Sequence, residues 1–280
     1  MRNRDERGSL AWIASDFRSL LPGASAGLMQ LMYPPLGHAV MTHSAFMDDP
    51  FGRVYRSIPQ IWSTILTPDG DTRAKQVRDL HKAIKGTDDS GARYHALDPD
   101  TFWWAHATFT WEMFRSVELF HRRQLDAAER GALYAETVEW YERYGVSMRP
   151  VPADIDSFDR RFAEICAHEL ERTPAAAYAI EIATNGRLGL PLIPPAVMRA
   201  IRPALANPGR AVAFGCMPSA VRTRMGIPWS RADRRTLALL KTTMRAGGSV
   251  VPAELNRRAM RFSLRQVGSR TRGERYQPAT

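Results

Sequence analysis

Residues 98–122 read DPDTFWWAHATFTWEMFRSVELFHR, and this stretch decides the fold class of the chain. Asp98 can cap free helix amides, Pro99 suits the first helical position, and Asp100 complements the positive end of the helix dipole. We therefore predict a helix over residues 99–122. Its side chains at steps of three or four form one large stripe, which is apolar except for a histidine: Phe102, His106, Phe109, Met113, Val117 and Phe120.

The histidine within this stripe, His106, has two interpretations. Burial on an apolar face disfavours the charged imidazolium and leaves a neutral ring whose free nitrogen can bind a metal. A core histidine that is hydrogen-bonded to a backbone carbonyl would show the same spacing, and on spacing alone it is the more common case. Periodicity therefore leaves both readings open.

The remainder of the chain shows the same helical character. Apolar residues recur at helical spacing almost everywhere, and no stretch longer than a few residues alternates as a strand does. We predict an all-α fold in which residues 85–97 and 183–195 are irregular connections, because both have turn-forming composition. Further helices are expected at 10–20, 24–47 with a kink at Pro34-Pro35, 51–66, 71–85, 126–145, 154–171, 195–205, 208–224, 230–246 and 252–265.

Composition bounds the location and the partners. The two cysteines, Cys166 and Cys216, are far apart, which argues against a disulfide framework or a structural zinc site and suits a reducing cytoplasm. Acidic residues interrupt any N-terminal run that could serve as the apolar region of a signal peptide, so we expect no secretion. Residues 19–47 carry no charged side chain, but prolines and polar residues interrupt them, so we expect a buried, kinked helix rather than a membrane span.

The net charge of +10 is concentrated in residues 231–275. Such an excess can attract nucleic acid or an anionic membrane surface. The sequence shows no helix-turn-helix, RRM or zinc-finger pattern, so we expect no specific nucleic-acid partner. A solvated basic surface is the favoured reading, and peripheral membrane contact is left open.

Other residues could bind anions or metals. Arg53, Arg56 and Ser57 would lie on one helix face, which suits a phosphate or a haem propionate, although an exposed basic face is equally compatible. His43 and His81 are ambiguous. Glu118 and His121 form an E-x-x-H pattern of the kind that di-iron bundles use, but such sites need a second copy, which the chain lacks. We expect His121 in the last helical turn, where a cation is favoured.

Several blocks in order resemble the bacterial family of uncharacterised domain 2236, which is similar to latex-clearing rubber oxygenases and to the ER-bound oxygenase of mycophenolic acid biosynthesis. The resemblance covers about residues 20–265 without large gaps. The blocks are GLMQLMYP (27–34), HSAFMDDP (43–50), Arg53-x-x-Arg56-Ser57, His81-x-x-x-x-Gly86, YHALDP (94–99), WAHAT (104–108), and Met217-Pro218 with Arg222, Gly226 and Trp229.

The resemblance implies a haem b-dependent oxygenase that activates O2 and acts on a hydrophobic substrate. His106 would be the proximal iron ligand, and the helix that carries Arg53, Arg56 and Ser57 would lie on the distal side. The cofactor would also be contacted by His81. Hydrogen bonds to oxygen or to the propionates would come from Arg53, Arg56 or His43. A helical haem or lipid carrier or sensor without turnover is the alternative.

The same resemblance implies a single domain. We predict an N-terminal segment over residues 1–19, the haem-binding domain over 20–265, and a disordered basic tail over 266–280. The expected location is cytoplasmic, with membrane association as a possibility.

Overall fold

The computed structural model describes residues 6–88, 91–185, 207–250, 254–258, 260 and 262. This part of the chain is mainly helical, which confirms the predicted all-α class, and it includes one short antiparallel hairpin. The elements are α1 (Leu10–Ala14), η1 (Phe17–Leu20), α2 (Gly23–Met32), α3 (Pro34–His43), α4 (Pro50–Leu66), α5 (Gly70–Leu80), β1 (Lys85–Thr87), β2 (Arg93–His95), α6 (Pro99–Phe120), α7 (Ala127–Glu142), α8 (Ile155–His168), α9 (Pro174–Thr184), α11 (Ser219–Arg224) and α12 (Arg231–Val250).

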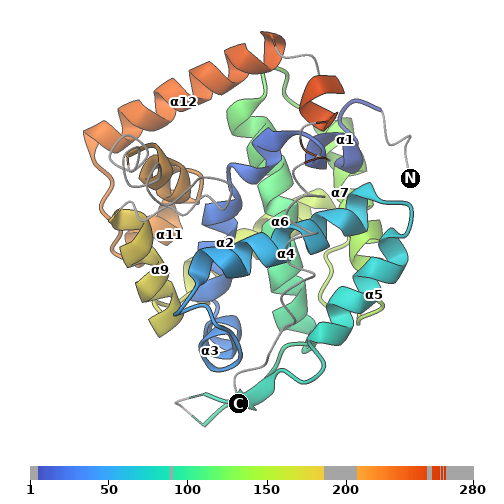
Figure 1. Ribbon diagram of the computed structural model, residues 1–280, viewed down its shortest axis with the longest axis vertical. Helices are drawn as coiled ribbons and strands as arrows, with labels where there is room; N and C mark the ends of the chain where they lie inside the picture. The colour runs from blue at the N-terminus through green and yellow to red at the C-terminus, as the bar shows by residue number, and fades with distance from the viewer. Residues whose placement is uncertain are drawn as a thin grey trace.

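Helix α6 runs through the middle of the molecule, with α12 crossing near one end and the hairpin near the other (Figure 1). It begins as predicted, because the Asp98 carboxylate accepts hydrogen bonds from the amides of Asp100 and Thr101. Buried side chains occur around its whole circumference, where the sequence predicted a single stripe. Packing partners on several sides account for this, since α1, η1, α2, α7 and α12 all contact α6.

The predicted kinked helix over residues 24–47 is two helices, α2 and α3. They separate at Tyr33, which is extended with ψ 116° because Pro34 disfavours a helical conformation in the residue before it. Leu28, Met29 and Met32 of α2 are buried in the core, as expected for this uncharged stretch. Among the residues that the structure describes, no helix is both long enough and apolar enough to cross a membrane.

The predicted irregular connection at residues 85–97 contains the hairpin of β1 and β2. Gly86 pairs with Tyr94, and a Cβ added at Gly86 would lie 2.5 Å from the Tyr94 hydroxyl oxygen. The tyrosine therefore occupies the space that any side chain at position 86 would need. Three-residue strands are too short to show alternation, which is why periodicity missed them.

The predicted helix pattern also differs from the structure after residue 170. Helix α9 was not predicted, although Thr173 caps the amide of Ala176 and Pro174 occupies the first helical position. The single helix predicted over 208–224 is divided, with residues 207–215 helical and α11 beginning after Pro218. The helix predicted at 195–205 and the tail at 266–280 lie outside the described residues.

Candidate functional site

His106 lies in the N-terminal half of α6, with its side chain against α7. The imidazole is packed against three aromatic rings of the α7 region, with centroid distances of 4.5 Å to Trp140, 5.0 Å to Tyr141 and 6.1 Å to Tyr144. Its Nε2 is 3.0 Å from the Thr137 carbonyl oxygen, so Nε2–H donates and Nδ1 carries the lone pair. Burial lowers the pKa of His106 to about 3, which leaves the ring neutral.

The donor chemistry at His106 suits a metal, but the surrounding space does not suit a haem. Nδ1 is buried and has no hydrogen-bond partner in the described part of the chain. The cavity beside the ring has a volume of only about 10 Å³, room for no more than about one water molecule. As α6 and α7 are packed here, a porphyrin does not fit at His106, and the two helices would have to separate to admit one.

His81 caps the C-terminus of α5 and presents the opposite nitrogen. Its Nδ1 is 2.8 Å from the Val77 carbonyl oxygen, so Nδ1–H donates and Nε2 carries the lone pair. A hydrogen bond from one ring nitrogen to a backbone carbonyl is the usual way in which proteins orient a metal-binding imidazole. Burial lowers the pKa of His81, and the positive charge of Arg53 lowers it further. The ring is therefore neutral, and its tautomer is that of an Nε2 ligand.

Phe102 links these two histidines. Its ring lies 6.1 Å from His81 and 5.3 Å from Tyr144, and Tyr144 in turn contacts His106. The structure thus brings two of the predicted site residues into one set of packed rings. We call this set the aromatic cluster, and it consists of His81, Phe102, His106, Trp140, Tyr141 and Tyr144.

Helix α4 borders the aromatic cluster at two points along its length. Arg53, near its start, lies close enough to His81 to lower the pKa of that residue. Thr64, near its end, accepts a hydrogen bond of 2.7 Å from Trp140 Nε1. Arg56 forms an ion pair of 3.2 Å with Asp49, whose side chain is 54% exposed. Asp49 therefore already neutralises part of the positive charge that was predicted to bind an anion.

The other predicted distal residues lie away from these contacts. His43 Nε2 is 3.1 Å from the Lys85 carbonyl oxygen and 3.3 Å from the Tyr94 hydroxyl, so the ring joins α3 to the hairpin. Ser57 is half-buried on α4. These contacts do not join His43 to the aromatic cluster, and the predicted roles of His43 and Ser57 stay predictions.

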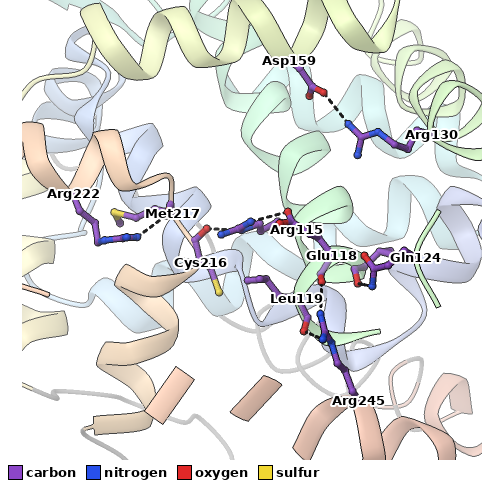
Figure 2. Close-up of polar contacts among 11 residues, drawn as sticks. Arg115, Glu118, Leu119, Gln124, Arg130, Asp159, Cys216, Met217, Arg222 and Arg245 are labelled. Atoms are coloured by element: carbon purple, nitrogen blue, oxygen red, sulfur yellow. Dashed lines mark hydrogen bonds and ion pairs between the residues drawn. The ribbon is translucent and has the colours of Figure 1, made fainter. Parts of the chain in front are cut away.

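The E-x-x-H pair does not form a joint site. Glu118 is 60% exposed and pairs with Arg115 at 2.7 Å, as Figure 2 shows. His121 is the C-cap of α6 and is buried. Burial, together with the charge of Arg18, lowers the pKa of His121 to about 4, so the expected cation is wrong. Across the described ranges, no group of three or more His, Cys, Asp or Glu side chains could hold a metal ion.

One buried acid was not predicted from the sequence. Glu112 is fully buried, neither carboxyl oxygen has a partner in the described part of the chain, and burial raises its pKa well above the ordinary range. Its side chain points at α2, where a Cβ on Gly23 would lie 2.9 Å from Oε1. Thr108, Glu112 and Ser116 recur at steps of four on α6, and this spacing was the available signal.

Comparison with known proteins decides the family. A family model described as "ER-bound oxygenase mpaB/B'/Rubber oxygenase, catalytic domain" matches residues 11–246. The chain belongs to this family. The match confirms the resemblance found in the sequence, supports oxygenase activity, and includes His43, Arg53, His81 and His106. No curated protein and no solved structure matches the chain.

Proposed function

We propose that this chain is a haem-dependent oxygenase that acts on an apolar substrate. The observation that carries the proposal is a neutral histidine with an available ring nitrogen in the aromatic cluster, within a chain of an oxygenase family. When bound, haem b supplies a redox-active iron that reacts with O2. The protein would supply the iron ligand, charge for the propionates and a water-poor surrounding.

Two histidines compete for the role of iron ligand. The family resemblance assigns it to His106, whose Nδ1 is unpaired but whose Nε2 is bonded to Thr137. His81 is oriented in the same way, because the Val77 carbonyl fixes Nδ1 and leaves Nε2 as the lone-pair nitrogen. Space favours His81, since ligation at His106 requires α6 and α7 to separate, whereas His81 is half-buried.

The residues of α4 would hold the charged edge of the cofactor. Arg53 adjoins His81 and bears a guanidinium that can form paired hydrogen bonds to a carboxylate. Arg56 can do the same if a propionate replaces Asp49, since that ion pair is partly exposed. Ser57 and His43 would donate further hydrogen bonds. The rings of the aromatic cluster would exclude water and favour an apolar substrate.

The absorbance spectrum of the full chain, purified after expression with haem supply, tests the cofactor. We expect a Soret band. Its loss in His81→Ala but not in His106→Ala would assign the ligand to His81, and the reverse result would assign it to His106. His168→Ala, at an exposed position at the end of α8, is the matched control. A protein without a Soret band would exclude the haem proposal, and full haem binding in both variants would exclude both ligands.

Turnover is tested separately from haem binding. The reduced holoprotein should consume O2 faster when a hydrophobic substrate such as a long-chain alkene is added. A stable complex with no O2 consumption for any substrate tried would instead favour the carrier or sensor. Because His43 is not one of the two candidate iron ligands, His43→Ala should keep the Soret band, and a fall in its O2 consumption relative to the parent chain would report on turnover.

A further inference from the structure

A large cavity lies at the C-terminal end of α6, away from the aromatic cluster. Its volume is about 690 Å³, and α1, η1, the segment after α6 and α12 contribute to its walls. His121 lines it, fifteen residues after His106, which places the two about 22 Å apart along the helix axis. Cavities of this size commonly take small organic molecules.

One part of the wall is apolar. Ile13 and Val117 are buried core residues, and Leu125 packs against the same core. His121 adds a neutral ring beside them, 5.7 Å from the Trp12 ring. These side chains offer a surface for a hydrocarbon chain or a ring system. None of them carries a negative charge that could bind a cation.

The rest of the wall is strongly basic. The only lining carboxylate among the described residues is Asp16, and Arg18 pairs with it at 2.5 Å. The arginines that line the cavity are Arg7, Arg18, Arg122, Arg123 and Arg245. At His121, burial lowers the pKa of the ring, and the charges of Arg18 and Arg7 lower it further, whereas the charge of Asp16 raises it.

Three of these arginines have structural duties. Arg18 is held by Asp16, and Arg123 pairs with Glu129 at 2.7 Å. Arg245 of α12 donates hydrogen bonds to the carbonyl oxygens of Glu118 at 2.8 Å and Leu119 at 3.1 Å, which satisfies the end of α6 (Figure 2). Their presence is explained without a ligand.

Arg7 and Arg122 have no such explanation. Arg7 lies over the Trp12 ring at 5.9 Å, and Arg122 is exposed directly after the C-cap of α6. Within the described residues, neither guanidinium is paired with a carboxylate. Two cations without a carboxylate partner among the described residues therefore line a cavity whose wall also includes apolar side chains.

We propose that this cavity binds an amphipathic organic anion. Its carboxylate or phosphate head would lie between Arg7 and Arg122, and its apolar body would rest on Ile13, Val117 and Leu125. An inorganic anion would leave most of the 690 Å³ unfilled. The site is separate from the proposed haem position and does not depend on it.

Titration calorimetry on the full chain tests the proposal with octanoate, octyl phosphate, octanamide and inorganic phosphate as probes. We expect octanoate or octyl phosphate to bind at least tenfold more tightly than octanamide and inorganic phosphate. The better of the two identifies the head group. Equal binding of octanamide would overturn the role of the arginines, and equal binding of inorganic phosphate would overturn the role of the apolar wall.

Paired charge variants place the site. Arg7→Gln with Arg122→Gln should weaken binding of the better probe on the order of tenfold or more. Lys75→Gln with Arg160→Gln removes the same charge at exposed positions on α5 and α8, and should leave binding within about twofold. Equal losses in both double variants would overturn the assignment to this cavity. Circular dichroism and thermal melting establish that each variant is folded.

Discussion

Helix α6 buries one neutral histidine in its N-terminal half and another at its C-terminal end, yet the two positions offer different chemistry. His106 is 6% exposed and His121 is 5% exposed, and burial lowers their pKa values to about 3 and about 4. Aromatic rings surround His106 and leave a cavity of about 10 Å³. Arginines and an open volume of about 690 Å³ border His121.

Burial alone therefore determines the protonation state of these histidines. It does not determine whether the ring packs in the core or borders a binding site. The ring at His106 contributes to a packed core, and α6 and α7 would have to separate before its unpaired Nδ1 could bind a metal. The ring at His121 forms part of a wall beside space that already exists. Room and neighbouring charge, rather than the pKa, distinguish the two positions.

The largest expected difference concerns stability. His106→Ala should lower the free energy of unfolding by about 3 kcal/mol, because it leaves a void among packed rings. His121→Ala should cost only about 1 kcal/mol, since that ring already borders a cavity. Urea unfolding of both variants without haem at pH 7 makes the measurement. An equal loss of unfolding free energy in the two variants would contradict the difference in packing between His106 and His121.

Acid should weaken both ends of α6. The folded-state pKa of each histidine lies below the ordinary value of 6.5. Their contribution is therefore complete above pH 6.5 and is lost as the pH falls from 6.5 toward about 4 for His121 and about 3 for His106. His106→Gln should lose about 2 kcal/mol less stability than the parent chain between about pH 6.5 and 4.5. An unchanged acid slope in unfolding experiments would show that folding does not lower the pKa of His106.

Glu112, between the two histidines along α6, should respond in the opposite direction. Its folded pKa lies above the ordinary value of 4.5, so its contribution is present below pH 4.5 and is lost as the pH rises through the folded pKa. Glu112→Gln should abolish this loss and stabilise the chain by about 1–2 kcal/mol at neutral pH. Glu118→Gln, at an exposed position on the same helix, is the control. If Glu112→Gln is less stable than the parent chain, the conclusion that the Glu112 carboxyl group is buried without a partner is wrong.

The smallest effect concerns the cap at the cavity end of α6. Arg245→Gln removes the donors to the Glu118 and Leu119 carbonyls and should cost about 0.5–1 kcal/mol. Arg235→Gln, an exposed arginine of α12, should cost less than about 0.5 kcal/mol. Thermal melting of the two variants provides the comparison, and equal stability would show that water replaces the cap.

The start of α6 could be predicted because its signals are local. Asp98, Pro99 and Asp100 lie within one turn, and each acts on the nearest amides. The pairing of Gly86 with Tyr94 joins strands of three residues, which are too short for any pattern to appear. The missed α9 shows a different cause, since Thr173-Pro174 was a readable start signal that the long apolar context obscured.

The candidate site could be predicted only in part. Family blocks indicated His81, Arg53 and His106, and the structure brings Arg53 near His81 and both histidines into the aromatic cluster. Which ring nitrogen is free depends on the carbonyls of Val77 and Thr137. The second carbonyl lies 31 residues from His106, on another helix, so the sequence carried no sign of it.

The burial of α6 on every side has a consequence for motion. A helix whose amides are covered by five neighbouring elements can exchange hydrogen with solvent only when those elements come apart together. Helix α5, whose exposed charged side chains include Asp71, Lys75 and Asp79, can open alone. In deuterated water, the backbone amides at the centre of α6 should therefore be the last to exchange. Their exchange rate should report the global free energy of unfolding.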